Sequence, residues 1–179
     1  MALAGCAVPA IDAYQPTIQN AVAVRQADIP TLSVGKFSLA PGRPASMDKS
    51  ITIRASNLRP PAGTSFSAFL GESLATELRS AGKLSPSADT VVEGELTDSK
   101  VSSAVGVGEA KLAATFRARR GTVVIYEKNL SVSAVWQSSF IGALAIPDAM
   151  NQYTGLYGKL VGALLQDEGF RQALRRPLP

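Results

Sequence analysis

The chain has 179 residues, of which 46% are hydrophobic and 18% charged, and its formal net charge is +4. These values fit one globular domain with a sizeable core, and no apolar run is long enough to predict a transmembrane helix. One cysteine and no histidine exclude an internal disulfide, a zinc site built from several His or Cys ligands, and nucleophiles activated by histidine. The basic excess is small and only 6% of the residues are aromatic, so we expect no nucleic-acid binding.

The N-terminus carries the most specific motif of the chain. Leu3-Ala4-Gly5-Cys6 matches the lipobox, at which a signal peptidase cuts before a cysteine that carries diacylglycerol. Two or three acyl chains, at about 0.8 kcal/mol per buried methylene, anchor a protein firmly. Only five residues precede Cys6, whereas a secretory signal needs an apolar stretch of roughly 7–15 residues. We therefore interpret residues 1–5 as the remnant of a lipoprotein signal peptide and predict lipidation of Cys6.

The residue after the cysteine bears on location. Ala7 follows Cys6, where an aspartate would favour retention in the inner membrane of enterobacteria. We therefore expect a lipid-anchored protein of the bacterial cell envelope, at the outer membrane and facing the periplasm, if it is exported from an upstream start.

Residues 6–30 lack a clear hydrophobic period and contain three prolines, Pro9, Pro16 and Pro30. This composition predicts a tether between the lipid and the domain. Residues 31–176 then form a single α+β domain.

The first part of that domain predicts two strands and a helix. Residues 31–39 and 49–55 are typical of strands, and stretches rich in Pro and Gly follow each of them. Residues 65–81 predict a helix that ends at Gly82. Its apolar residues recur at three- and four-residue spacing, namely Phe66, Phe69, Leu70, Leu74 and Leu78.

The second part predicts three strands and two helices. Apolar and polar residues alternate over 90–97, 107–119 and 122–136, which indicates antiparallel strands with one buried face. A helix is expected to start near Pro147, because proline suits a first helical turn, and a short helix containing Phe170 follows. Three glycines of the longer helix, Gly155, Gly158 and Gly162, are expected to let it lie close to the sheet.

Apart from the short final helix, the predicted element order is β-β-α-β-β-β-α. An antiparallel sheet of about five strands with two amphipathic helices packed on one face satisfies this order. The fold class is therefore α+β.

Two further features leave alternatives open. Glu93 and Glu95 lie two residues apart on a predicted strand and thus on the same side; a solvent-facing pair opposite basic residues is favoured over a cation or acid–base site. The stretch 136–147 is apolar and rich in small residues. It is either a buried crossover that closes the core or an exposed patch that docks a partner or lipid.

Four features together resemble a known group of proteins. They are the lipobox Leu3-Ala4-Gly5-Cys6, the segment Thr64-Ser65-Phe66 with its helix, the strand Val92-Glu93-Gly94-Glu95-Leu96, and Trp136 to Pro147 before a Tyr- and Leu-rich helix. The chain resembles the small envelope lipoproteins of Gram-negative bacteria, including the YajG-like lipoproteins, and more distantly the ABC-transport auxiliary lipoproteins and the lipopolysaccharide-assembly lipoprotein LptE. The resemblance implies an accessory protein of a transport or assembly machine and supplies no catalytic residues.

From the sequence we expect a protein that is not an enzyme and holds no cofactor or metal. Composition alone leaves carboxylate or lysine chemistry open. We expect it to contact the membrane through the lipid on Cys6 and to bind an envelope protein. The alternative is a carrier of lipids or amphiphiles, which needs an apolar cavity between the helices and the sheet.

Overall fold

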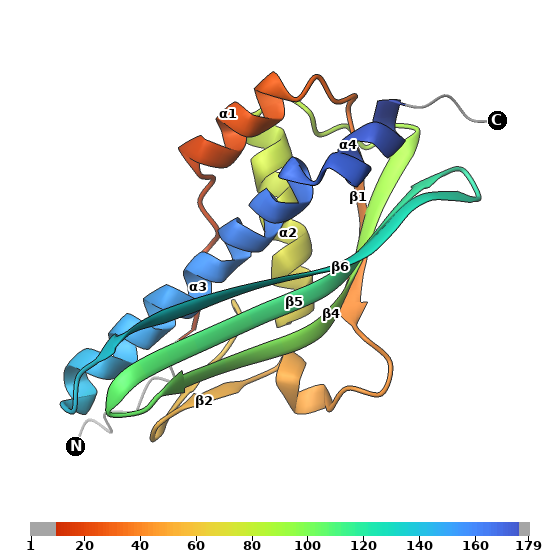
Figure 1. Cartoon of the computed structure of the whole chain (residues 1–179). Helices are drawn as coiled ribbons and strands as arrows, with labels where there is room; N and C mark the ends of the chain where they lie inside the picture. The colour runs from red at the N-terminus through yellow and green to blue at the C-terminus, as the bar shows by residue number, and fades with distance from the viewer. Residues whose placement is uncertain (1–9, 176–179) are drawn as a thin grey trace, which may run out of the picture.

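The computed structural model describes residues 10–175, so the lipobox and Cys6 lie outside the described residues. The helices and strands of this part of the chain are shown in Figure 1. In chain order they are α1 (Ile18–Gln26), β1 (Ser33–Leu39), the 3-10 helix η1 (Ala45–Asp48), β2 (Ile51–Ile53), β3 (Ser56–Leu58), α2 (Phe66–Ser80), β4 (Thr90–Ser103), β5 (Gly106–Arg120), β6 (Val123–Ser138), α3 (Gly142–Gln166) and α4 (Glu168–Arg175). The α+β class is confirmed. No helix within residues 10–175 has the length and apolar content needed to cross a bilayer.

Four strands form the main sheet in the order β1-β4-β5-β6. The strands β4, β5 and β6 pair antiparallel, as the alternating pattern predicted. The strand β1 pairs parallel to β4, so the expectation of a wholly antiparallel sheet was wrong here. The reason is that α2 lies between β1 and β4 in the chain and serves as the crossover that parallel neighbours require.

The second predicted strand, over residues 49–55, is also corrected by the structure. The chain turns at Arg54, whose φ is 53°, and β2 and β3 form a separate two-stranded hairpin. The main sheet therefore has four strands instead of about five.

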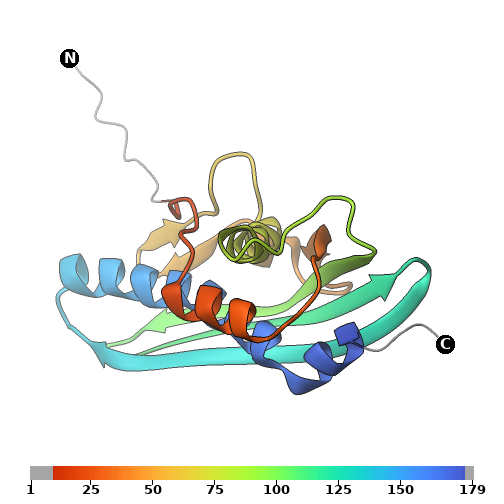
Figure 2. The ribbon, with the colours of Figure 1, turned by 90° about the horizontal axis from the view of Figure 1, so that it is seen from above.

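The helices α2 and α3 cover one face of the sheet, as predicted, and Figure 2 shows no other helix of the described residues over the middle of the opposite face. The Oγ atom of Ser65 accepts a hydrogen bond from the Ala68 amide and caps α2. The helix α3 begins at Gly142, before the predicted start near Pro147, because the Ile141 carbonyl already accepts from the Leu144 and Ala145 amides.

The core lies between these helices and the sheet. Its largest side chains are fully buried and include Phe66, Phe69, Phe116, Tyr153 and Tyr157. The hydroxyls of the two tyrosines are hydrogen-bonded to each other at 2.9 Å, and Tyr153 also bonds Ser99 at 2.7 Å. These bonds offset the desolvation of hydroxyls in an apolar interior.

The N-terminal segment differs most from the prediction. We call residues 10–29 the N-terminal strap. It contains α1, and its side chains Val24 and Ile29 are buried; Ala10 pairs with Arg59 next to β3. The prediction of a tether over residues 6–30 was therefore wrong for the part from Ala10 onward, because these residues dock on the helical layer.

Candidate functional site

Several polar groups of the N-terminal strap converge on one buried acid, Glu77 of α2. Its Oε1 atom accepts hydrogen bonds from the Tyr14 hydroxyl at 2.6 Å, the Thr17 amide at 3.0 Å and the Thr17 hydroxyl at 3.1 Å. The Asn20 Nδ2 atom donates to the same oxygen at 3.0 Å and to the Gly158 carbonyl of α3 at 2.9 Å. Burial, and then the hydrogen bond to Glu77, raise the pKa of Tyr14 well above its ordinary value. This network joins three elements through polar contacts.

Small residues on α3 allow the strap to approach closely. A Cβ atom on Gly158 would lie 2.9 Å from the Tyr14 hydroxyl oxygen, and one on Gly162 would lie 2.6 Å from Asn20 Oδ1. A Cβ atom on Gly155 would meet nothing within 4 Å. The sequence predicted that these glycines bring α3 close to the sheet. The structure instead places Gly158 and Gly162 against the strap, so their role there is to make room for this contact.

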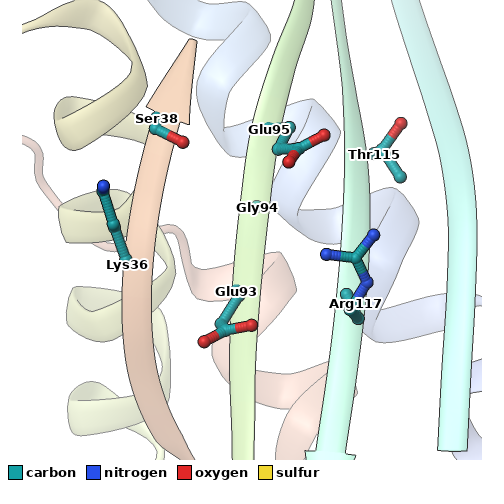
Figure 3. A pocket seen from close by; sticks show the side chains of 7 residues that line it. All are labelled: Lys36, Ser38, Glu93, Gly94, Glu95, Thr115 and Arg117. Atoms are coloured by element: carbon teal, nitrogen blue, oxygen red, sulfur yellow. The ribbon is translucent and has the colours of Figure 1, made fainter. Parts of the chain in front are cut away.

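The bare side of the sheet, which we call the open face, carries charged residues. Figure 3 shows a hollow on this face, about 240 Å³ in volume, lined by Lys36, Ser38, Glu93, Gly94, Glu95, Thr115 and Arg117. The Arg117 Nε atom lies 2.7 Å from Glu127 Oε2. This contact raises the pKa of Arg117 and lowers that of Glu127. The Arg117–Glu127 ion pair is a cross-strand contact on a solvated surface and contributes little to stability.

The structure settles the position of the acid pair singled out in the sequence. Glu93 is in register with Arg117 of β5, and its Oε2 atom lies 3.9 Å from Arg119. Glu95 lines the same hollow. The interpretation as a pair opposite basic residues is confirmed for Glu93. Among the described residues, no three Asp, Glu, His or Cys side chains gather closely enough to hold a metal ion.

The strand β6 forms one edge of the sheet. It runs for 16 residues without glycine or proline, and its stretch Leu130–Val135 holds no charged side chain. The side chains of Ser131, Ser133 and Val135 are exposed. Backbone donors and acceptors on a long edge strand are free to pair with an added strand. The alternation of apolar and polar residues in the sequence already indicates a strand with one buried face. Which strand lies at the edge of the sheet follows only from the pairing order in the structure.

One end of the sheet exposes apolar side chains, which we call the apolar tip. They come from the β4–β5 turn, the adjoining parts of β5 and β6, and the start of α3: Val105, Val107, Val135, Phe140, Ile141 and Leu144. Phe140 is 76% exposed and Leu144 61%. The alternative of a buried crossover over residues 136–147 is therefore wrong for Phe140–Leu144, although Ala145 is buried.

The apolar tip is braced by Arg54 from the β2–β3 turn. Its Nε atom donates to the Ser103 carbonyl at 2.6 Å, and its Nη1 and Nη2 atoms donate to the carbonyls of Phe140 and Ser139. One guanidinium thus satisfies backbone acceptors from both the β4–β5 turn and the chain before α3. Sequence analysis did not identify Arg54, because its partners lie 49 to 86 residues away in the chain.

The space between the helices and the sheet is filled by packed side chains in the part of the chain described. The rings of Phe66 and Tyr153, and of Phe69 and Tyr157, contact edge-on at centroid distances of 5.8 Å and 4.8 Å. A groove of about 500 Å³ lies elsewhere, between residues 10–17 and α3. The packing between helices and sheet therefore gives the carrier alternative no support.

Comparison with known proteins places the fold. No protein-family model and no curated protein matches the chain. Among solved structures, protein XCC0632 from Xanthomonas campestris, of the DUF330 family, aligns with a TM-score of 0.56 at 14% identity, covering 87% of this chain and 93% of that one. A minor lipoprotein from Acinetobacter baumannii aligns with a TM-score of 0.50 at 12% identity, covering 84% of this chain and 98% of that one. At these identities the likeness concerns the fold alone, which this chain shares with the Xanthomonas protein and the Acinetobacter lipoprotein.

Proposed function

We propose that this protein is a lipid-anchored lipoprotein of the bacterial cell envelope that binds a partner protein, without catalysis, as an accessory of a transport or assembly machine. The lipobox ending at Cys6 and the fold shared with a minor lipoprotein support the anchor. The outer membrane, with the domain facing the periplasm, is the location we propose.

The observation that carries the binding role is the free edge of β6. Two features precede the charge-free stretch Leu130–Val135 on β6. One is a bulge in the β5–β6 pairing near Ile125, and the other is Lys128, whose Nζ atom lies 2.7 Å from Asp167 Oδ2. Bulges and lysines are devices that protect sheet edges. They lie at one end of β6 and leave Leu130–Val135 free, so an extended segment of a partner can add to the sheet there.

In-cell photo-crosslinking tests this role. A crosslinking amino acid is placed at Ser133 on β6 and, as the matched control, at Ser102, an exposed serine on β4, which is two strands away from β6. We expect an adduct of defined mass from Ser133, its loss when Ser131→Lys places a charge on the edge, and no adduct from Ser102. Equal adducts from both positions, or none from Ser133, would contradict binding at this edge.

The lipid anchor has its own test. The gene is expressed with its upstream in-frame codons, and the mass of the mature N-terminus is measured beside that of Cys6→Ser. We expect a mass increase equal to a diacylglycerol with or without a third acyl chain, and its absence in the variant. An unmodified Cys6 in the mature protein would remove the anchor from the proposal.

A further inference from the structure

The described part of the N-terminal strap begins toward the same end of the molecule as the apolar tip (Figure 1). Figure 1 shows the β4–β5 turn, the end of β6 and the first turn of α3 together at one end, while α1 and α4 lie toward the other. The strap begins at Ala10, which pairs with Arg59 after β3. The tip's brace, Arg54, lies only five residues before Arg59, or about 16 Å along extended chain.

The reach of the chain links this end to Cys6. Three residues separate Cys6 from Ala10 in sequence, and an extended chain spans at most about 14 Å over the four steps between their Cα atoms. A lipid on Cys6 therefore lies at most a few tens of ångströms from the apolar tip. This distance is short enough for the lipid and the apolar tip to contact the same membrane surface.

The chemistry of the tip suits a lipid surface. Its side chains are aliphatic or aromatic and project from a turn, a strand end and a first helical turn, with Phe140 and Leu144 more than half exposed. The Ser103, Ser139 and Phe140 carbonyls are already hydrogen-bonded to Arg54. Backbone acceptors that are satisfied internally cost less to bring into an apolar medium.

We propose that the apolar tip, centred on Phe140 and Leu144, inserts into the surface of the bilayer that holds the lipid on Cys6. In the anchored domain, the end of the sheet that carries the apolar tip then contacts the membrane, and β6 and the open face extend away from the membrane. This inference rests on the proposed anchor only in taking Cys6 as the point of attachment. Insertion places the tip side chains about 5–10 Å into the boundary between headgroups and acyl chains.

The experiment uses the single cysteine of the full chain as an artificial anchor. Cys6 is coupled to a maleimide lipid in vesicles of phosphatidylethanolamine and phosphatidylglycerol whose acyl chains carry bromine, a contact quencher of tryptophan fluorescence. The sole tryptophan is removed by Trp136→Phe, and a reporter is introduced by Phe140→Trp. The matched control carries the reporter through Ile18→Trp, because Ile18 is 85% exposed on α1, away from the tip (Figure 1).

We expect bromine quenching of the position-140 reporter to exceed that of the position-18 reporter at least about threefold, given the expected depth of insertion. Equal quenching, or stronger quenching at position 18, overturns the proposal and leaves the tip to a protein partner or a second copy. If the Trp136→Phe variant unfolds, hydrogen exchange is measured instead on the chain without substitutions, coupled to the lipid through Cys6. Slower exchange of residues 139–146 on vesicles supports insertion, and unchanged exchange overturns the proposal. Because the maleimide lipid supplies the anchor, failure here is separate from failure of natural lipidation.

Discussion

Replacing Glu77 tests whether the N-terminal strap is an integral part of the fold. The Oε1 atom of this side chain accepts four hydrogen bonds from Tyr14, Thr17 and Asn20, while its Oε2 atom is buried and has no hydrogen-bond partner among residues 10–175. The variant Glu77→Ala removes the shared acceptor. The variant Glu77→Gln keeps an oxygen where the donors converge and replaces the unpartnered oxygen with an amide group.

The magnitude follows from the donors left behind. An unsatisfied buried donor costs about 1–3 kcal/mol, and the Glu77→Ala variant leaves several donors without their shared acceptor. Because the donors of Tyr14 and Thr17 are only partly buried and regain water when the strap opens, we expect Glu77→Ala to lower the free energy of unfolding by about 3–5 kcal/mol. In a chain of this size that corresponds to a drop in Tm of about 6–20 °C. Glu77→Gln keeps the shared acceptor but puts an amide donor where Oε2 has no partner among the described residues. It should therefore lower the free energy of unfolding by about 1–3 kcal/mol, less than Glu77→Ala.

Urea denaturation and native-state hydrogen exchange measure these effects. In Glu77→Ala, exchange should accelerate over residues 10–30 before the amides of β4 and β5 respond, because the strap opens locally. The reasoning is refuted if Glu77→Ala leaves stability and strap exchange unchanged. It is also refuted if Glu77→Gln is as damaging as Glu77→Ala, since the shared acceptor would then not be the cause.

Three further predictions follow from the same contacts. The variant Gly162→Ala should lower the free energy of unfolding measured in urea, although alanine has the better helix propensity, because its Cβ atom would lie 2.6 Å from the Asn20 Oδ1 atom of the strap. The variant Gly155→Ala has open space around its Cβ atom and should raise the free energy of unfolding by about 0.5–1 kcal/mol. Equal effects of the two variants would contradict the contact between Gly162 and the strap. The variant Arg54→Ala should cost about 1–3 kcal/mol in thermal unfolding and speed hydrogen exchange over residues 139–146, and unchanged exchange there would count against the brace. Burial raises the pKa of Tyr153 and Tyr157, so the folded state keeps protons that the unfolded chain releases above pH 10. The contribution of these tyrosines to stability should be constant below that pH and fall above it by about 1.4 kcal/mol per pH unit for each tyrosine. An unchanged urea midpoint between pH 9 and 11 would refute this prediction.

The elements whose contacts follow a local period were readable from the sequence. The strands β4 to β6 alternate because one face is buried against the helices, and α2 repeats apolar residues at helical spacing after a serine cap. The fold class and the one-sided helical layer follow from these patterns. The lipobox is also a local motif, and it remains the basis for the prediction at Cys6.

Only the tertiary structure decided how distant segments meet. The strap has no apolar period because much of its contact is polar and converges on an acid about 60 residues away, so its composition resembled that of a linker. The parallel pairing of β1 depends on the path of the chain through α2, and the exposure of Phe140 depends on where the sheet ends. A sequence records which residues are apolar, but whether such a residue is covered depends on which neighbours the fold brings to it.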